Sequence, residues 1–202
     1  MSDRAQPDSR TDLARRYADA LTGRAAFDCR SGLFLAAPRP GFVLHDLVPE
    51  LQARGILTVY VDLSDRLRDP AALVADALKA ALRDAQGWLS AGLERLGIGP
   101  RVAFDVEGIG AGQGPTLTQA LRVLAERANK PVTLIIDEAE RAATTEAGAN
   151  MMHALKAARD ALGHAEAGAT PRLMLVFAGS DRGALASLVL RRDQPFFGAE
   201  IV

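Results

Sequence analysis

Short apolar segments alternate with longer amphipathic segments along most of the chain, and this alternation predicts the fold class. Four runs of strand length are almost continuously apolar: residues 33–37 (LFLAA), 56–63 (ILTVYVDL), 132–137 (VTLIID) and 172–178 (RLMLVFA). Strands of this kind are buried on both faces, as in parallel sheets whose connections are helices. The pattern therefore predicts an α/β fold, a three-layer α/β/α sandwich with a mostly parallel central sheet.

The segments between these runs have helical spacing and helix-end signals. Pro49 would kink the second of the expected helices or mark its true start, and Gly87 could break the third. Thr116 and Gln119 form a capping box before the fourth. The expected helices cover residues 12–22, 42–54, 69 to about 96, 117–128, 144 to about 162, and 181 to about 190.

Three further segments are harder to assign. Residues 101–107 (RVAFDVE) alternate between apolar and polar side chains, which predicts an edge strand or hairpin arm. The final AEIV, residues 199–202, could begin a fifth strand. The glycine-rich stretch 108–116 (GIGAGQGPT) precedes a helix start and could meet an anion there. Because it carries no cation, we favour a simple connecting loop.

Composition narrows the class of protein. The 202 residues are 49% hydrophobic and 24% charged, which is the balance of one globular domain. The net charge of −1 gives no positive field for nucleic acid. The single cysteine, Cys29, allows no internal disulfide, which fits a reducing compartment. No apolar run has the length of a membrane span and the polar start is no signal peptide, so we predict a cytoplasmic protein.

The strongest chemical signal is the acid pair Asp137 and Glu138, at the end of the third apolar run. In parallel α/β folds, ligands bind beyond the carboxyl ends of the strands, where these two side chains emerge. One carboxylate could hold Mg²⁺ through water while the other orients and activates an attacking water. The alternative is structural: Asp137 caps a helix and Glu138 lies favourably in its first turn.

A second signal follows the fourth apolar run, in LMLVFAGSDR at 173–182. Ser180 could sense a terminal phosphate, and Arg182 could reach an anion. The alternative is an ordinary strand–turn–helix connection, with Gly179 in the turn and Asp181 as the helix cap. On its own, this segment favours the alternative.

Taken together, these segments resemble P-loop ATPases of the AAA+/STAND type. IIDEA, residues 135–139, resembles the Walker B strand; residues 175–199, ending in PFFGA, resemble the next strand and sensor segment; LFLAAPR, residues 33–39, resembles the first strand and the opening of the phosphate loop. The resemblance implies the strand order first, fourth, third, second. It also implies ATP and Mg²⁺ as ligands, with Asp137 at the metal and Glu138 activating water. The residues it places beside the nucleotide are Pro38, Arg39, Gly41, Ser180 and Arg182.

The sequence departs from this family at the phosphate loop. Residues 36–43 read AAPRPGFV, without the lysine and the Ser/Thr of the Gly-x-x-x-x-Gly-Lys-Ser/Thr pattern, and the corner is several residues short. Two functions stay open: an ATPase-family domain with weak or absent turnover, or a pseudo-ATPase acting as an interaction or regulatory module for a protein partner or a homo-oligomer. For domain organisation, we expect an N-terminal helical segment over 1–30 and an ATPase-like core over 31–202 without a C-terminal lid.

Overall fold

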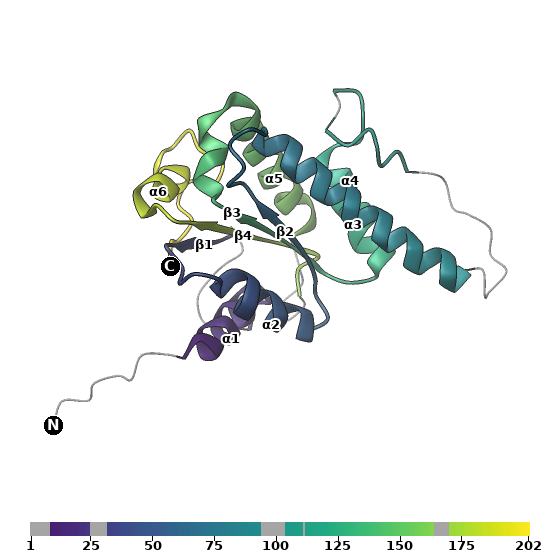
Figure 1. The fold of residues 1–202 in the computed structure, drawn as a ribbon, viewed down its shortest axis with the longest axis horizontal. Coiled ribbons are helices and arrows are strands. Elements are labelled where there is room, and N and C mark those ends of the chain that lie inside the picture. Colours follow the sequence, from purple (N-terminus) through teal and green to yellow (C-terminus); the bar gives the residue numbers. More distant parts are fainter. Residues whose placement is uncertain (1–8, 25–31, 94–103, 111, 164–169) are drawn as a thin grey trace.

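The computed structural model describes residues 9–24, 32–93, 104–110, 112–163 and 170–202, and they form three layers (Figure 1). The middle layer is a parallel sheet in the order β1-β4-β3-β2. Helices α3, α4 and α5 cover one face, and α1 and α2 cover the other. This confirms the predicted α/β fold and the strand order implied by the resemblance. The strands are β1 Leu33–Ala36, β2 Leu57–Asp62, β3 Val132–Asp137 and β4 Leu173–Gly179.

The sheet separates two hydrophobic clusters, because successive side chains of a strand point to opposite faces. In β3, Leu134 and Ile136 belong to the larger cluster under α3, α4 and α5, whereas Ile135 belongs to the cluster under α1 and α2. Every residue of β4 is buried, and Asp137 is the only residue of β3 that is not. Burial on both faces explains why these strands are continuous apolar runs in the sequence.

Most helix boundaries agree with the expected ranges. The Thr116–Gln119 capping box is present, with both side-chain-to-backbone bonds formed. The helix after β2 runs through Gly87 without the break that we considered. The helices are α1 Arg10–Leu21, η1 Val43–Leu47, α2 Val48–Ala53, α3 Pro70–Leu93, α4 Leu117–Ala128, η3 Ala139–Thr144, α5 Glu146–Leu162 and α6 Arg182–Leu190.

The single helix expected over 42–54 is two elements. The first, η1, is a π-helix, and the N–H of Val48 donates to the carbonyl of Val43, five residues back. Pro49 is the second residue of α2 and has no N–H to donate. A wider turn just before the proline relieves the steric conflict that an α-helical turn would create with the carbonyl four residues earlier.

The prediction of an edge strand over 101–107 is wrong for the residues of this segment that the structure describes. Residues 104–107 are irregular, while 101–103 lie outside the described residues. The apolar positions there have another cause: Val106 and Ile109 are buried in the cluster that contains α3 and α4. At the end of the chain, Ile201 forms one parallel bridge with Phe34, and the N–H of Ala36 donates to the carbonyl of Val202 at 2.9 Å. AEIV therefore begins to extend the sheet beside β1.

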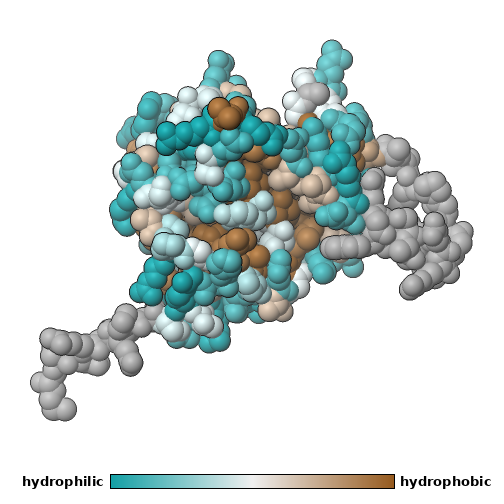
Figure 2. Space-filling model, viewed as in Figure 1, coloured by the Kyte–Doolittle hydropathy of each residue, from teal (hydrophilic) through white to brown (hydrophobic). Residues whose placement is uncertain are grey.

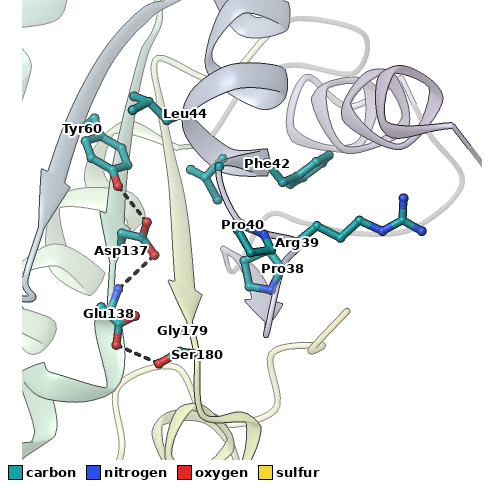
Figure 3. A pocket seen from close by; sticks show the side chains of 12 residues that line it. Pro38, Arg39, Pro40, Phe42, Leu44, Tyr60, Asp137, Glu138, Gly179 and Ser180 are labelled. Atoms are coloured by element: carbon teal, nitrogen blue, oxygen red, sulfur yellow. Dashed lines mark hydrogen bonds between the residues drawn. The ribbon is translucent and has the colours of Figure 1, made fainter.

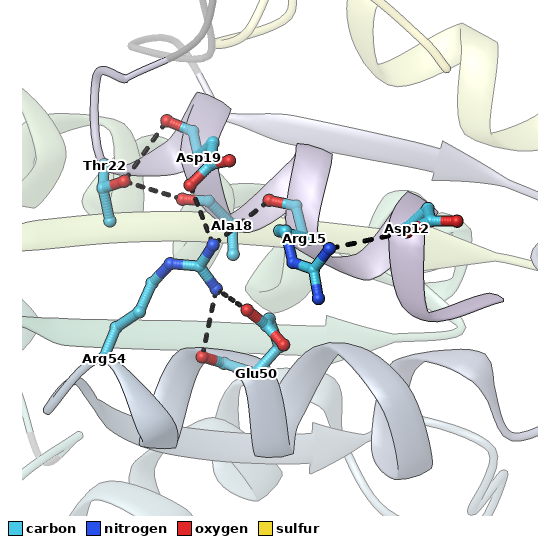
Figure 4. Close-up of polar contacts among 7 residues, drawn as sticks. All are labelled: Asp12, Arg15, Ala18, Asp19, Thr22, Glu50 and Arg54. Atoms are coloured by element: carbon cyan, nitrogen blue, oxygen red, sulfur yellow. Dashed lines mark hydrogen bonds and ion pairs between the residues drawn. The ribbon is translucent and has the colours of Figure 1, made fainter. Parts of the chain in front are cut away.

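Helix α1 is held to α2 by a partly buried arginine (Figure 4). The guanidinium of Arg54, at the end of α2, forms ion pairs with Asp19 of α1 at 2.8 Å and with Glu50 of α2. The Arg54 side chain is only 16% exposed. Arg10 and Asp46 form a further ion pair between α1 and η1 at 2.5 Å. The N-terminal helix is thus part of the same layer as α2.

Candidate functional site

A cavity of about 330 Å³ lies at the carboxyl ends of the strands (Figure 3). The corner after β1 supplies residues 38–44, β2 supplies Tyr60, β3 leads to Asp137 and Glu138, and β4 leads to Gly179 and Ser180. Parallel strands direct all these ends to one edge of the sheet. Six of the seven predicted site residues line this cavity: Pro38, Arg39, Gly41, Asp137, Glu138 and Ser180. The seventh, Arg182, is exposed at the start of α6 and is not among the lining residues.

Asp137 accepts two hydrogen bonds within the cavity wall. Its Oδ2 accepts from the hydroxyl of Tyr60 at 2.7 Å, and its Oδ1 accepts from the N–H of Glu138 at 3.1 Å. Burial, and then the hydrogen bond to the Asp137 carboxylate, raise the pKa of Tyr60 above its ordinary value. The phenol therefore stays a proton donor throughout the neutral range. The sequence analysis missed Tyr60; its signal is that a tyrosine in a half-buried strand needs a partner for its hydroxyl.

Glu138 lies at a sharp turn in the backbone. Its φ of 53° is in the left-handed region, which turns the chain out of β3 and into η3. Its Oε2 accepts a hydrogen bond from the Ser180 hydroxyl at 2.9 Å. The N-cap residue of η3 is Glu138, without a side-chain capping bond, so the alternative in which Asp137 caps this helix and Glu138 lies in its first turn is wrong. The acids instead join the ends of β2, β3 and β4.

Glu140 is a second residue that the sequence analysis missed. Its Oε1 accepts from the backbone N–H groups of Ser180 and Asp181 at 3.1 and 3.2 Å, and from the Ser180 hydroxyl at 3.3 Å. Its Oε2 is buried against Gly179 and has no hydrogen-bond partner in the described part of the chain. Glu140 therefore fixes the turn after β4. Asp181 caps α6 from that turn, as the structural alternative for this segment predicts, with bonds of 2.8 and 3.0 Å to the first turn of the helix.

The corner between β1 and η1 offers few free backbone donors. Pro38 and Pro40 have no N–H. The N–H of Ala37 donates to the carbonyl of Gly179 at 2.7 Å, and that of Phe42 donates to the carbonyl of Arg39 at 2.9 Å. Within residues 37–42, this leaves only the amides of Arg39 and Gly41 to face an anion.

Two of the three charged residues that line the cavity are acids. Asp137 and Glu138 bring two carboxylates to its wall, while the side chain of Arg39 points away from them toward solvent (Figure 3). Gly41 has a φ of 72°, and a β-carbon there would lie 2.7 Å from the Cδ2 atom of His45, so this glycine has a structural reason to be present. Over the described ranges, no cluster of three or more His, Cys, Asp or Glu residues could hold a metal ion.

Solved structures share this arrangement of strands and helices. A Walker-type ATPase of Pyrococcus abyssi matches with a TM-score of 0.62 and 16% identity, over 96% of this chain and 52% of that one. The Aeropyrum pernix ORC2 protein in its ADP form matches with a TM-score of 0.52 and 13% identity, over 100% and 50%. The ORC1 protein of the same organism, solved in complex with DNA, matches with a TM-score of 0.50 and 16% identity, over 94% and 42%.

These similarities establish the fold and no more, because the identities are 16% or lower. The chain has the fold of P-loop NTPase-like proteins and spans about half the length of the solved structures it resembles. No protein-family model matches the sequence, and no curated protein matches it. Of the helices in the described residues, none has the length and apolar character needed to span a membrane.

Proposed function

We propose that this chain is a pseudo-ATPase: a domain with an ATPase fold that does not turn over ATP and serves as an interaction or regulatory module. The observation that carries the proposal is the corner between β1 and η1. Between Ala37 and Phe42 it has two amides to offer a phosphate, no lysine and no hydroxyl. The cytoplasm remains the compartment we propose, on the composition alone.

A phosphate loop works by surrounding the anion with successive backbone N–H groups and a lysine. At a catalytic site, loss of a single preorganised donor lowers the rate by roughly 10²–10³. Here Pro38 and Pro40 remove two donors, and the amides of Ala37 and Phe42 are bonded within the protein. The effects of these missing donors are not additive, but each of them weakens phosphate binding and lowers the rate of hydrolysis.

The acids of the cavity oppose binding of a triphosphate that carries no Mg²⁺. Without a bridging cation, Asp137 and Glu138 would face the negative charge of the nucleotide, and Arg39 is turned outward. Their carboxylates already accept hydrogen bonds from Tyr60 and Ser180, so the protein satisfies them without a metal ion. Retention of the two acids is therefore compatible with a structural role.

A second candidate is an ATP-binding domain with weak turnover. The acid pair favours it, because both carboxylates lie at the end of β3 and Ser180 lies beside Glu138 at 2.9 Å. In this case Asp137 would hold Mg²⁺ and Glu138 would activate water. ATP would lie against the first corner and the turn after β4, beside Pro38, Arg39, Gly41, Ser180 and Arg182.

Calorimetric titration with ATP and Mg²⁺, paired with a phosphate-release assay, separates the two candidates. For the pseudo-ATPase we expect no binding heat at millimolar ATP, no hydrolysis, and the same result for Asp137→Ala. Micromolar binding that Asp137→Ala abolishes would contradict the proposal and support the second candidate. Glu126→Ala, a change of an exposed acid on α4 that does not line the cavity, is the control for altered charge.

Inserting a longer phosphate loop tests whether the short corner after β1 is the reason that the chain would not bind ATP. Insertion of Gly-x-Gly-Lys-Ser after Arg39 should raise the affinity for ATP, because it adds backbone donors and an ammonium at the corner. The same insertion with alanine in place of lysine is the control for loop length. If the lysine-containing insert binds ATP no better than the unaltered chain, the missing loop is not what prevents binding.

A further inference from the structure

We propose that the outer edge of β2 pairs with β2 of a second copy of this chain, so that the two sheets become one continuous sheet across a two-fold axis. The inference is independent of nucleotide binding. It rests on the unpaired backbone groups of β2, the apolar surface around them, and the register that a symmetric pairing would give.

The direction of the backbone groups in β2 follows from its bonds to β3. The N–H of Leu57 donates to Pro131 at 2.9 Å, and the N–H of Leu63 donates to Asp137 at 3.1 Å. In a parallel strand, alternate residues direct their N–H and C=O groups to the same neighbour. Leu57 and Leu63 differ by an even number, so the odd-numbered residues face β3. The N–H and C=O groups of Thr58, Tyr60 and Asp62 therefore face outward.

The two edges of the sheet differ. At β1, the terminal residues bridge the outer edge: the N–H of Val202 donates to the carbonyl of Phe34 at 2.9 Å. At β2, the described residues provide no strand on the outer side. Proteins protect exposed edges with lysine, proline or a bulge. The run from Leu57 to Asp62 contains neither lysine nor proline, and its register with β3 is unbroken.

Apolar surface surrounds this edge. Figure 2 shows hydrophobic side chains gathered in a hollow at the middle of the face where Figure 1 places β2. Leu57 of β2 is only half-buried, and so are Leu73, Ala77 and Ala81 along α3, which packs on β2. The small side chains of α3 would allow the same helix of a second copy to approach closely.

The sequence of β2 suits pairing with itself. An antiparallel pair centred on Tyr60 places Tyr60 opposite Tyr60 and Thr58 opposite Asp62 of the second copy, so all three outward residues are paired. Like charges do not meet in this register. The Tyr60 hydroxyl is bonded to Asp137 of its own chain, which turns the ring inward and leaves the edge open.

The polar side chains at this edge also fit each other. Thr58 Oγ1 accepts a bond from the Gln52 side chain at 3.0 Å, so the threonine proton can be donated. Asp62 uses Oδ1 for the N–H of Ser64 at 2.8 Å, and its Oδ2 has no hydrogen-bond partner in the part of the chain that the structure describes. A Thr58 hydroxyl of one copy could therefore donate to Asp62 of the other, twice in each dimer.

Two substitutions at Thr58 test the proposal, because they change the cross-strand pair in opposite directions at one position. Sedimentation equilibrium should show a reversible dimer with twice the 21.4 kDa mass of the chain. Thr58→Lys should tighten the dimer, and Thr58→Asp, which faces Asp62, should weaken it. Each change should be roughly 2- to 30-fold in the dissociation constant, since the pair occurs twice. The double variant Thr58→Asp with Asp62→Lys should restore dimerisation.

Hydrogen exchange supplies a second measurement, and circular dichroism melting confirms that each variant is folded. In the dimer, the amides of Thr58, Tyr60 and Asp62 should exchange more slowly as protein concentration rises. A chain that stays monomeric at the highest attainable concentration would overturn the proposal. A dimer whose dissociation constant is the same for both Thr58 variants would also overturn it. So would a dimer in which the protected amides lie outside β2, because the pairing would then use another surface.

Discussion

Gly179→Ala provides a sharp test of the turn that positions Ser180. Gly179 ends β4 and is buried. A β-carbon there would collide with Oε2 of Glu140 and lie 3.1 Å from its Cδ and 3.2 Å from Leu185 Cδ1. Leu185 is fully buried in the core, so the Glu140 carboxylate is the group that must move. Gly112→Ala, where a β-carbon meets nothing within 4 Å, is the control.

The expected loss of stability follows from the hydrogen bonds that Glu140 would lose. Its Oε1 accepts hydrogen bonds from the N–H groups of Ser180 and Asp181, and it shares the single hydroxyl proton of Ser180 with Glu138. Bonds to a charged acceptor contribute about 1.5–3 kcal/mol each. Ser180 and Asp181 are exposed, so water replaces part of the loss. We expect Gly179→Ala to lower the free energy of unfolding by roughly 2–4 kcal/mol, and the melting temperature by roughly 5–15 °C.

Urea unfolding of Gly179→Ala, Glu140→Ala and the double variant measures this directly. Removing the Glu140 side chain makes room for the new methyl group. The double variant should therefore be more stable than the sum of the single effects predicts, by about 1–2 kcal/mol. Gly112→Ala should change the stability by less than about 0.5 kcal/mol. If Gly179→Ala is as stable as the unaltered chain, or if the two changes are additive, the contact does not hold the turn.

Two further predictions concern the helix layer and alkaline stability. Arg54→Ala should lower the free energy of unfolding by about 1–3 kcal/mol in urea, because it leaves Asp19 and Glu50, 35% and 24% exposed, without their cation. Arg39→Ala, at an exposed site, should change it by less than about 0.5 kcal/mol. Because the pKa of Tyr60 is raised in the folded state, its protonated hydroxyl contributes its full stabilisation below the pKa of about 10 that tyrosine has in the unfolded chain. This contribution is lost as the pH rises above that value. Tyr60→Phe should therefore flatten the alkaline loss of stability in pH-dependent melting; an unchanged profile would assign that loss to other groups.

The sheet was predictable because strands that are buried on both faces have almost continuously apolar sequences. The β3 run is apolar apart from the buried Thr133 and the terminal Asp137, the β4 run is apolar, and the polar residues that follow them mark the edge where the cavity lies. The strand order came from the resemblance and not from the pattern, since apolar runs do not record which strand lies beside which. The alternation over 101–107 misled because burial of Val106 against helices gives the same spacing as a strand.

The missed residues act through contacts that no local pattern encodes. Glu140 meets Ser180 across 40 positions of sequence, and Tyr60 meets Asp137 across 77. The left-handed backbone of Glu138 was equally hidden, because glutamate has no preference for that region. Only the arrangement of three parallel strands brings these groups together.

These contacts bear on what the acid pair means. Tyr60 donates to Asp137, the N–H of Glu138 donates to the same carboxylate, and Ser180 donates to Glu138 and lies against Glu140. This chain of hydrogen bonds crosses the ends of β2, β3 and β4. Loss of Tyr60, Asp137 or Ser180 would leave a partly buried polar group without this partner, which destabilises the fold whether or not a nucleotide is bound. An acidic pair after an apolar strand therefore does not by itself indicate hydrolysis. The backbone donors of the corner between β1 and η1 bear more directly on our proposal, and most of them are absent or already bonded.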